Sequence, residues 1–167
     1  ELISWATFNR RLIGKALGNM AACELTEILN ATHNSITAWG ENCFIHRKGA
    51  SNVESGEPVI VAGSRGTYSY LVAPTGDGLE NIHSIAHGAG RKWNRQSTRD
   101  RVRAKHDDMQ QLLKTKLGTD VICPDKTLLY EEAPEAYKDV STVIDDLQSF
   151  KLAAVLAELR PIVNIKP

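Results

Sequence analysis

The stretch EPVIVAGSRGTYSYLVA (residues 57–73) predicts two β-strands joined by a turn. Residues 57–63 and 68–73 are rich in branched and aromatic side chains, which are typical of β-strands. Glycines and hydroxyl side chains gather between these two runs, over residues 62–70. The pattern predicts two strands with a connection that suits either a phosphate- or nucleotide-contacting turn or an ordinary link between strands.

Around this stretch, strands and helices come in separate blocks. Residues 42–47 form another short apolar run and are predicted to be a strand. Apolar groups at three- and four-residue steps predict an amphipathic helix over residues 2–20. Because strands and helices do not alternate as in βαβ units, we predict a single α+β domain over residues 1–167, with a mixed or antiparallel sheet packed against helices.

The second half of the chain is predicted to be mainly helical. A long helix is expected over residues 97–118, with Ser97 or Thr98 as its N-terminal cap. Another helix is expected over residues 133–150, where a proline stands in the first turn. Residues 152–166 combine a helical start with a strand-like end.

The composition excludes several classes of protein. The 167 residues carry 20 basic and 20 acidic side chains, so this is not a uniformly basic nucleic-acid binder, and the 42% of hydrophobic residues argues against disorder. No apolar run approaches the about 20 residues of a membrane helix. Three widely spaced cysteines without a CxxC pair favour a reducing compartment. We therefore expect a soluble cytoplasmic protein with no membrane partner, and the start at Glu1 suggests a piece of a longer one.

The stretch HSIAHGAGRKWNR (residues 83–95) carries the main candidate for chemistry, His87. A neutral imidazole is a good nucleophile toward phosphorus, and the small residues 88–90 leave backbone N–H groups open to an anion. Arg91 and Arg95 could bind phosphate from one side of a helical turn. An ordinary turn histidine beside a solvated basic helix fits the same residues.

Two other features are open to more than one interpretation. Residues 91–105 hold seven Arg or Lys side chains against one Asp, which suits either a nucleic-acid backbone or a solvated helix face. His33 could bind a metal, although a lone histidine is more often a packed or exposed residue.

Four motifs in one order carry a resemblance to a known family. They are HRKGA (46–50), GSRGTYSYLV (63–72), HGAGRKWNR (87–95) and EAPEAYKDV (132–140), and a near-terminal Ile-Lys follows them. This order resembles the C-terminal part of RtcB-type RNA ligases, including their subfamily coupled to a release-factor-like protein. The resemblance extends over nearly the whole chain.

The resemblance implies an activity and a set of site residues. The implied reaction uses GTP and Mn²⁺ to join RNA ends carrying a 3′-phosphate or 2′,3′-cyclic phosphate to 5′-hydroxyl ends. His87 matches the family's histidine that attacks the α-phosphate of GTP and carries GMP. The implied nucleotide contacts are Ser64, Ser69, Gly88, Ala89, Gly90, Tyr137 and Lys166. The implied RNA-phosphate contacts are Lys48, Arg91 and Arg95, and the implied manganese ligand is His33.

The chain also departs from the family pattern. Ala62 and Arg65 replace residues of the usual PGSMG stretch, Asn94 stands where serine is common, and Pro follows Lys166 in place of Gly. The family's other metal ligands belong to an N-terminal half that this chain does not contain. We therefore expect that half as a partner, and we expect the chain alone neither to ligate RNA nor to guanylylate efficiently.

Two other functions stay open from the sequence. One is a non-catalytic RNA- or nucleotide-binding module that kept the fold and lost the chemistry. The other is a metal-dependent phosphodiesterase, for which five scattered histidines without acidic partners at ligand spacing give poor support.

Overall fold

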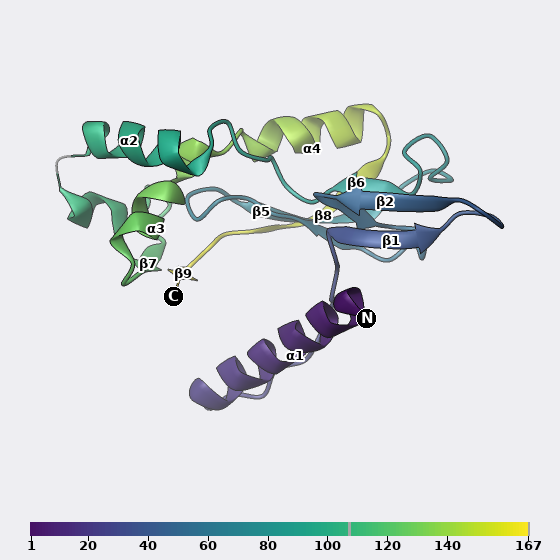
Figure 1. Ribbon diagram of the computed structural model, residues 1–167, viewed down its shortest axis with the longest axis horizontal. Coiled ribbons are helices and arrows are strands. Elements are labelled where there is room, and N and C mark those ends of the chain that lie inside the picture. Colours follow the sequence, from purple (N-terminus) through teal and green to yellow (C-terminus); the bar gives the residue numbers. More distant parts are fainter. Residues whose placement is uncertain (107, 167) are drawn as a thin grey trace.

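Residues 57–73 contribute two neighbouring strands to a three-stranded antiparallel sheet. A computed structural model describes residues 1–106 and 108–166 (Figure 1). Strand β4 (Val59–Val61) pairs with β5 (Ser69–Pro74), and β5 pairs on its other side with β8 (Ala153–Leu159). The two strands predicted over residues 57–73 are thus confirmed, and the glycine-rich connection joins neighbouring strands.

Small strand pairs surround this sheet. They are the antiparallel pair β1 (Asn34–Ala38) and β2 (Phe44–Lys48), the antiparallel pair β3 (Ala50–Asn52) and β6 (Ser84–Ala86), and the parallel pair β7 (Asp120–Ile122) and β9 (Val163–Ile165). The α+β class is confirmed. The helical start expected at residue 152 is wrong: these Ala- and Leu-rich residues form β8, because pairing with β5 overrides their helix propensity.

One apolar core lies between the sheet and helix α4 (Val140–Ser149), which covers one face of it in Figure 1. Its fully buried members include Val61 on β4, Val72 on β5 and Ile85 on β6. Alternating burial on β4 faces Val59 and Val61 inward, as expected for a strand covered on one face. This core holds β4 and β6 in place. The segments that directly follow these two strands line the candidate site.

A second apolar cluster joins helices α2 (Arg95–Lys105) and α3 (Lys126–Glu131) to β7. The helix expected over residues 97–118 is wrong at both ends. Its cap is Asn94, whose side chain accepts a hydrogen bond from the Ser97 amide at 2.8 Å, and it ends at Lys105 before an extended His106. A short 3₁₀-helix, η1 (Met109–Leu112), follows.

The helix expected over residues 133–150 is also divided. Pro134 starts only a 3₁₀-turn, η2 (Pro134–Ala136), and Tyr137 is extended. Helix α4 begins after Asp139, whose carboxylate accepts from the Ser141 amide at 3.0 Å. Tyr137 therefore lies outside both helices, in an extended segment that forms an antiparallel bridge with Arg91.

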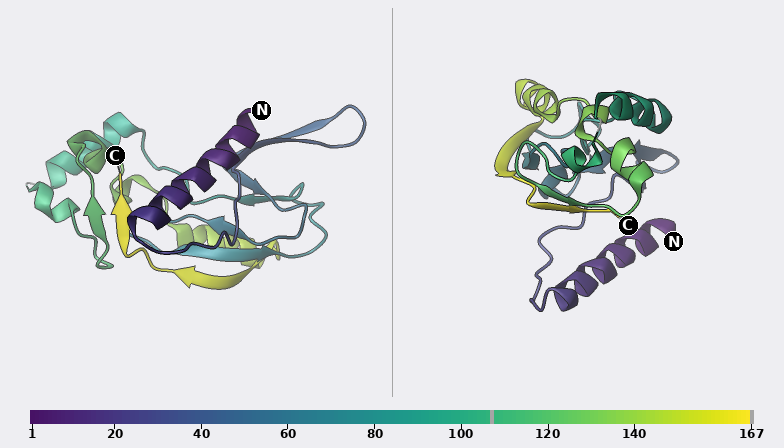
Figure 2. Two further views of the ribbon diagram at one scale, coloured as in Figure 1. Left: turned by 90° about the horizontal axis from the view of Figure 1, so that it is seen from below. Right: turned by 90° about the vertical axis from the view of Figure 1, so that its left-hand side faces the viewer.

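Helix α1 (Leu2–Met20) confirms the amphipathic helix predicted at the start of the chain. The right-hand view in Figure 2 shows it standing apart from the sheets. Its apolar side chains, such as Trp5 and Phe8, are largely exposed in the part of the chain that the structure describes. Within that part, no helix combines the length and the apolar character needed to cross a membrane.

Candidate active site

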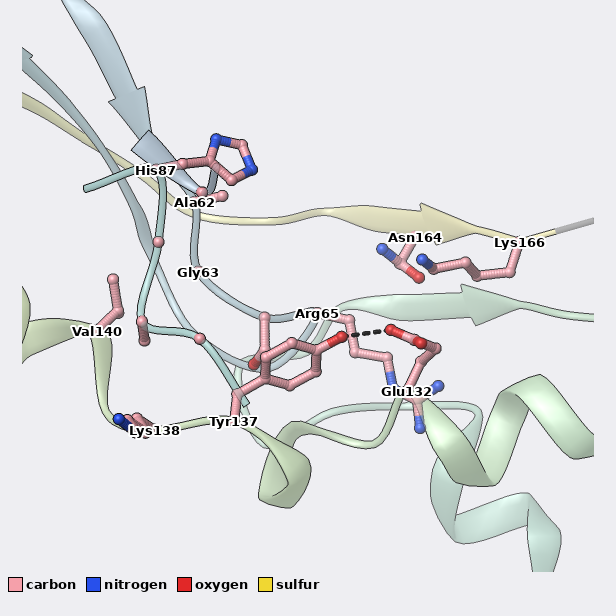
Figure 3. A pocket seen from close by; sticks show the side chains of 15 residues that line it. Ala62, Gly63, Arg65, His87, Glu132, Tyr137, Lys138, Val140, Asn164 and Lys166 are labelled. Atoms are coloured by element: carbon pink, nitrogen blue, oxygen red, sulfur yellow. Dashed lines mark hydrogen bonds between the residues drawn. The ribbon is translucent and has the colours of Figure 1, made fainter. Parts of the chain in front are cut away.

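A cavity of about 340 Å³ opens beside His87. It is lined by the small residues after His87, the turn after β4, the extended segment at Tyr137 and the end of β9 (Figure 3). Of the residues expected at a nucleotide site, Ser64, Gly88, Ala89, Gly90, Tyr137 and Lys166 all line this one cavity together with His87. Residues scattered over a hundred positions of sequence are therefore brought to one place.

His87 is held in the cavity wall by its backbone and its ring. Its amide donates to the Gly49 carbonyl at 3.0 Å, and its carbonyl accepts from the Ala62 amide at 2.6 Å. The ring stacks on that of His33, with centroids 3.9 Å apart and planes 12° apart. Burial lowers the pKa of His87, and the His33 ring lowers it further, so the imidazole is neutral near pH 7 and able to act as a nucleophile.

Backbone packing and conformation explain why glycine stands at positions 88 and 90, in addition to the expected contact with an anion. Gly88 forms a parallel bridge with Ala62, and a Cβ at position 88 would lie 2.6 Å from the Ala62 carbonyl oxygen. Gly90 has a φ of +71°, in the left-handed region that favours glycine, and its carbonyl accepts from the Lys138 amide at 3.0 Å. The loop is thus held by Ala62 at one end and by Lys138 at the other, and among the described residues no large side chain covers its backbone on the cavity side.

The turn between β4 and β5 is held by its own hydroxyl groups. The Ser64 amide donates to Thr67 Oγ1 at 2.7 Å, and the Gly63 amide donates to Ser69 Oγ at 3.0 Å. Ser64 faces the cavity, whereas Ser69 is not among the residues that line it and supports the turn from behind. A nucleotide contact from Ser69 stays a prediction.

Sequence reasoning missed Glu132, which organises the far side of the cavity. Its carboxylate accepts a short hydrogen bond from the Tyr137 hydroxyl (Figure 3) and pairs with Arg91 at 3.2 Å. Burial alone would raise the pKa of Glu132, but the Tyr137 hydrogen bond and neighbouring cations hold it below its ordinary value. Burial and this same bond raise the pKa of Tyr137. Glu132 therefore carries a charge at neutral pH and Tyr137 keeps its proton.

Arg91 supports this arrangement from outside the cavity lining. Its guanidinium makes five hydrogen bonds, as many as it has N–H groups. The acceptors are the Trp93 carbonyl, the Glu131 carbonyl, Thr98 Oγ1, Glu132 Oε1 and the Tyr137 hydroxyl, at 2.6–3.3 Å. In this structure Arg91 positions Tyr137 and Glu132, and an RNA-phosphate contact from it stays a prediction.

The other residues expected at the RNA phosphate, Arg95 and Lys48, do not line the cavity. Arg95 is 69% exposed and lies 3.6 Å from a Glu132 oxygen. Lys48 is exposed at the end of β2 and lines a separate hollow beside the start of α1. Along α2, Arg99 and Lys105 lie 3.8 and 3.0 Å from Glu131 and Glu135. The basic run of α2 is therefore offset in part by acidic side chains of the neighbouring α3–η2 segment.

The expected manganese ligand His33 lies beside His87, directly before β1. Among residues 1–106 and 108–166, no three His, Cys, Asp or Glu side chains come together as a metal site. Mn²⁺ prefers several oxygen ligands, and a pair of imidazoles does not supply them. The described residues do not fit a manganese site by themselves, so no step below is derived through the metal.

Comparison with known proteins identifies the family of this chain. The family profile described as "tRNA-splicing ligase RtcB" matches residues 3–167. The chain is 39% identical to "RNA-splicing ligase RtcB2" of Escherichia coli, over 99% of this chain and 44% of that protein. It is 35% and 33% identical to "RNA-splicing ligase RtcB homolog 1" of Entamoeba dispar and Entamoeba histolytica, over 74% of this chain.

The chain thus spans less than half of the length of these curated relatives. The profile nonetheless covers almost all of the chain, including the His87 loop, the turn after β4 and the extended segment at Tyr137. The chain belongs to the RtcB family.

Proposed function

We propose that this chain supplies the nucleophile and part of the nucleotide pocket of a GTP- and Mn²⁺-dependent RNA ligase. The ligase would join RNA 3′-phosphate or 2′,3′-cyclic phosphate ends to 5′-hydroxyl ends. One observation carries the proposal: a half-buried His87 with lowered pKa lines a cavity large enough for a small ligand, together with bare glycines, Ser64 and Tyr137. In such a protein His33 would be this chain's contribution to metal binding.

The first step would transfer a nucleotide to the ring. An unprotonated nitrogen of His87 attacks the α-phosphorus of GTP, an N–P bond forms, and the bond to pyrophosphate breaks. Backbone N–H groups of residues 88–90 and the cations Lys138 and Lys166, which line the cavity, would offset the charge of the phosphates. A 3′-phosphate oxygen of RNA then takes GMP from His87, and the 5′-hydroxyl displaces GMP to make the phosphodiester.

Covalent labelling of the full-length protein that contains this chain tests the proposal. With α-labelled GTP and Mn²⁺ we expect a protein adduct that survives alkali and is lost in acid, as a phosphoramidate is, and that maps to the peptide carrying His87. γ-Labelled GTP should leave no label on the protein, since pyrophosphate departs. A full-length protein that joins RNA without this adduct would contradict the mechanism.

The pH dependence of adduct formation follows from the environment of His87. Burial disfavours the imidazolium, so the nucleophilic neutral ring persists to a lower pH than the ordinary histidine pKa of 6.5 would allow. We expect single-turnover rates to be flat from about pH 7 to 8 and to fall only below about pH 6.5. The measurement is the adduct rate at saturating GTP across this range. An acid limb centred above the ordinary value would mean that the ring is not desolvated when it reacts.

A further inference from the structure

Helix α1 carries an apolar face that the described residues leave largely uncovered. The helix has 19 residues and is therefore about 28 Å long. Its large apolar side chains recur mostly at steps of three or four residues, and each of the following is between 48% and 84% exposed: Leu2, Trp5, Phe8, Leu12, Leu17 and Met20. A soluble protein rarely leaves so long a run of large apolar side chains in water, so this face calls for a partner.

The polar side of α1 is already engaged within the chain. Arg10 Nε donates to Asn30 Oδ1 at 2.6 Å, and Arg11 pairs with the Glu27 carboxylate at 2.8 Å. Gly18, on the same side of the helix, is buried. The segment that follows α1 thus folds back along its polar side, and the apolar face is turned away from that segment.

These contacts disfavour a membrane as the partner of α1. An amphipathic helix that lies on a membrane directs its cations to the lipid headgroups. Here Arg10 and Arg11 are held by side chains of the same chain instead.

A second copy of the chain also explains too little. An α1 helix packed on another α1 would leave a further apolar set uncovered around β9, where Ile162, Val163 and Ile165 are at least 50% exposed. Two exposed apolar sets on separate elements favour one larger occupant that packs against both.

The full-length protein offers an occupant of that size. The E. coli relative matches 99% of this chain, but the match covers only 44% of that relative. A full-length protein of similar length would have to pack its other 56% (100% less 44%) beside the residues described above. An apolar helix face is the ordinary means of joining such layers into one core.

The apolar face lies near the chemistry of the proposed function. A hollow of about 610 Å³ opens between α1, the segment that follows it and the sheet. Arg10 and Lys15 on α1, Ile60 on β4 and His87 all line this hollow. His87 also lines the nucleotide cavity, so the residue is reached from two sides. Polypeptide seated on α1 would complete the site on the second of these sides.

We propose that the apolar face of α1 is the docking surface for the part of the full-length protein outside residues 1–167. This contact holds that part against the α1 side of His87. The effect on chemistry rests on the proposed function, whereas the docking itself needs no nucleotide.

Hydroxyl-radical footprinting of the full-length protein tests the docking. We expect the side chains of Trp5 and Phe8 to be oxidised at least about fivefold more slowly than in the urea-unfolded protein, because the centre of an interface excludes water. Equal rates in the folded and unfolded protein would overturn the docking. Protection that disappears when a dimer dissociates on dilution would assign the face to a second copy. Protection seen only with vesicles of phosphatidylserine and phosphatidylcholine would assign it to a membrane.

A pair of substitutions at one position connects the docking to activity. Phe8→Asp places a charge in the contact, so we expect Trp5 to become as reactive as in the unfolded protein. We also expect the rate of His87 adduct formation to fall by about 10-fold or more, because a small displacement of the site is costly. GTP affinity should change by less than about threefold, since the nucleotide cavity is lined by other elements. Phe8→Leu keeps the contact apolar and should retain both protection and adduct.

The outcomes separate the docking from the proposed function. Trp5 still protected in a folded Phe8→Asp protein would overturn the docking, and the wild-type footprint decides the matter if that variant does not fold. An exposed Trp5 in a wild-type protein that forms the His87 adduct would overturn the docking and leave the proposed function intact. A protected Trp5 in a wild-type protein that forms no adduct would support the docking and overturn the proposed function.

Discussion

Replacing His87 with alanine is expected to abolish both the covalent GMP adduct and the joined RNA product in the full-length protein, by at least about 10³-fold. The ring is the nucleophile in the proposed reaction, and water or a neighbouring group cannot take its place at the same distance from phosphorus. Its backbone bonds to Gly49 and Ala62 do not involve the side chain, so the variant should fold. Adduct formation and ligation are measured on the same preparation, with thermal unfolding as the control for structure.

The variant Lys166→Ala serves as the control for His87→Ala, because it tests whether a lysine is the nucleophile instead. Lys138 and Lys166 also line the cavity, and a lysine amine can likewise carry a nucleotide through an N–P bond. If His87 is the nucleophile, Lys166→Ala weakens GTP binding but still forms adduct. Adduct retained in His87→Ala and lost in Lys166→Ala would move the covalent chemistry from the imidazole to the amine. RNA affinity retained in His87→Ala would agree with loss of chemistry alone.

The substitution Gly88→Ala is expected to reduce adduct formation by about 100-fold or more. The added Cβ would lie 2.6 Å from the Ala62 carbonyl oxygen, which is backbone and cannot turn away, so the 87–88 segment must separate from β4. That shift moves the His87 ring, and a displacement of about 1 Å from the reactive geometry costs on the order of 10²-fold in rate. We also expect a loss of about 1–3 kcal/mol in the free energy of unfolding.

Gly90→Ala in the same loop provides the comparison. A Cβ there meets no atom within 4 Å, although the φ of +71° costs about 1 kcal/mol for a residue with a side chain. We expect this variant to be slightly destabilised and to form adduct within a few-fold of the wild-type rate. If the two alanine variants lose activity equally, the close approach of Gly88 to Ala62 is not what positions His87.

Local pattern was enough to predict the parts of the site that are contiguous in sequence. The two strands around the β4–β5 turn and the bare loop after His87 follow from residues that neighbour one another. The same reasoning failed for the helix at 97–118, because Asn94 offers a cap three residues earlier than Ser97 and the chain unwinds at His106. Capping and termination depend on which side-chain oxygen reaches which amide, and spacing alone does not decide it.

The site residues that the sequence did not reveal are placed by contacts between segments far apart in the chain. Glu132 matters because Arg91 and Tyr137 meet at its carboxylate, and no pattern within residues 126–136 signals that meeting. Asn164 lines the cavity because β9 pairs with β7, which lies about forty residues earlier in the chain. Arg65 was visible as a departure from the family pattern, but its burial and the hydrogen bond from its Nη2 to the Leu129 carbonyl depend on tertiary packing against α3.

The parallel pairing of β9 with β7 affects the order in which parts of the fold form during synthesis. Lys166 is fixed by its amide, which donates to the Ile122 carbonyl at 2.9 Å, and Asn164 pairs in register with Val121. On a ribosome β3 to β6 and the His87 loop emerge before β9, and β9 must close a loop of about forty residues to reach β7. The cavity wall that Asn164 and Lys166 form is therefore complete only after β9 has left the ribosome and paired with β7.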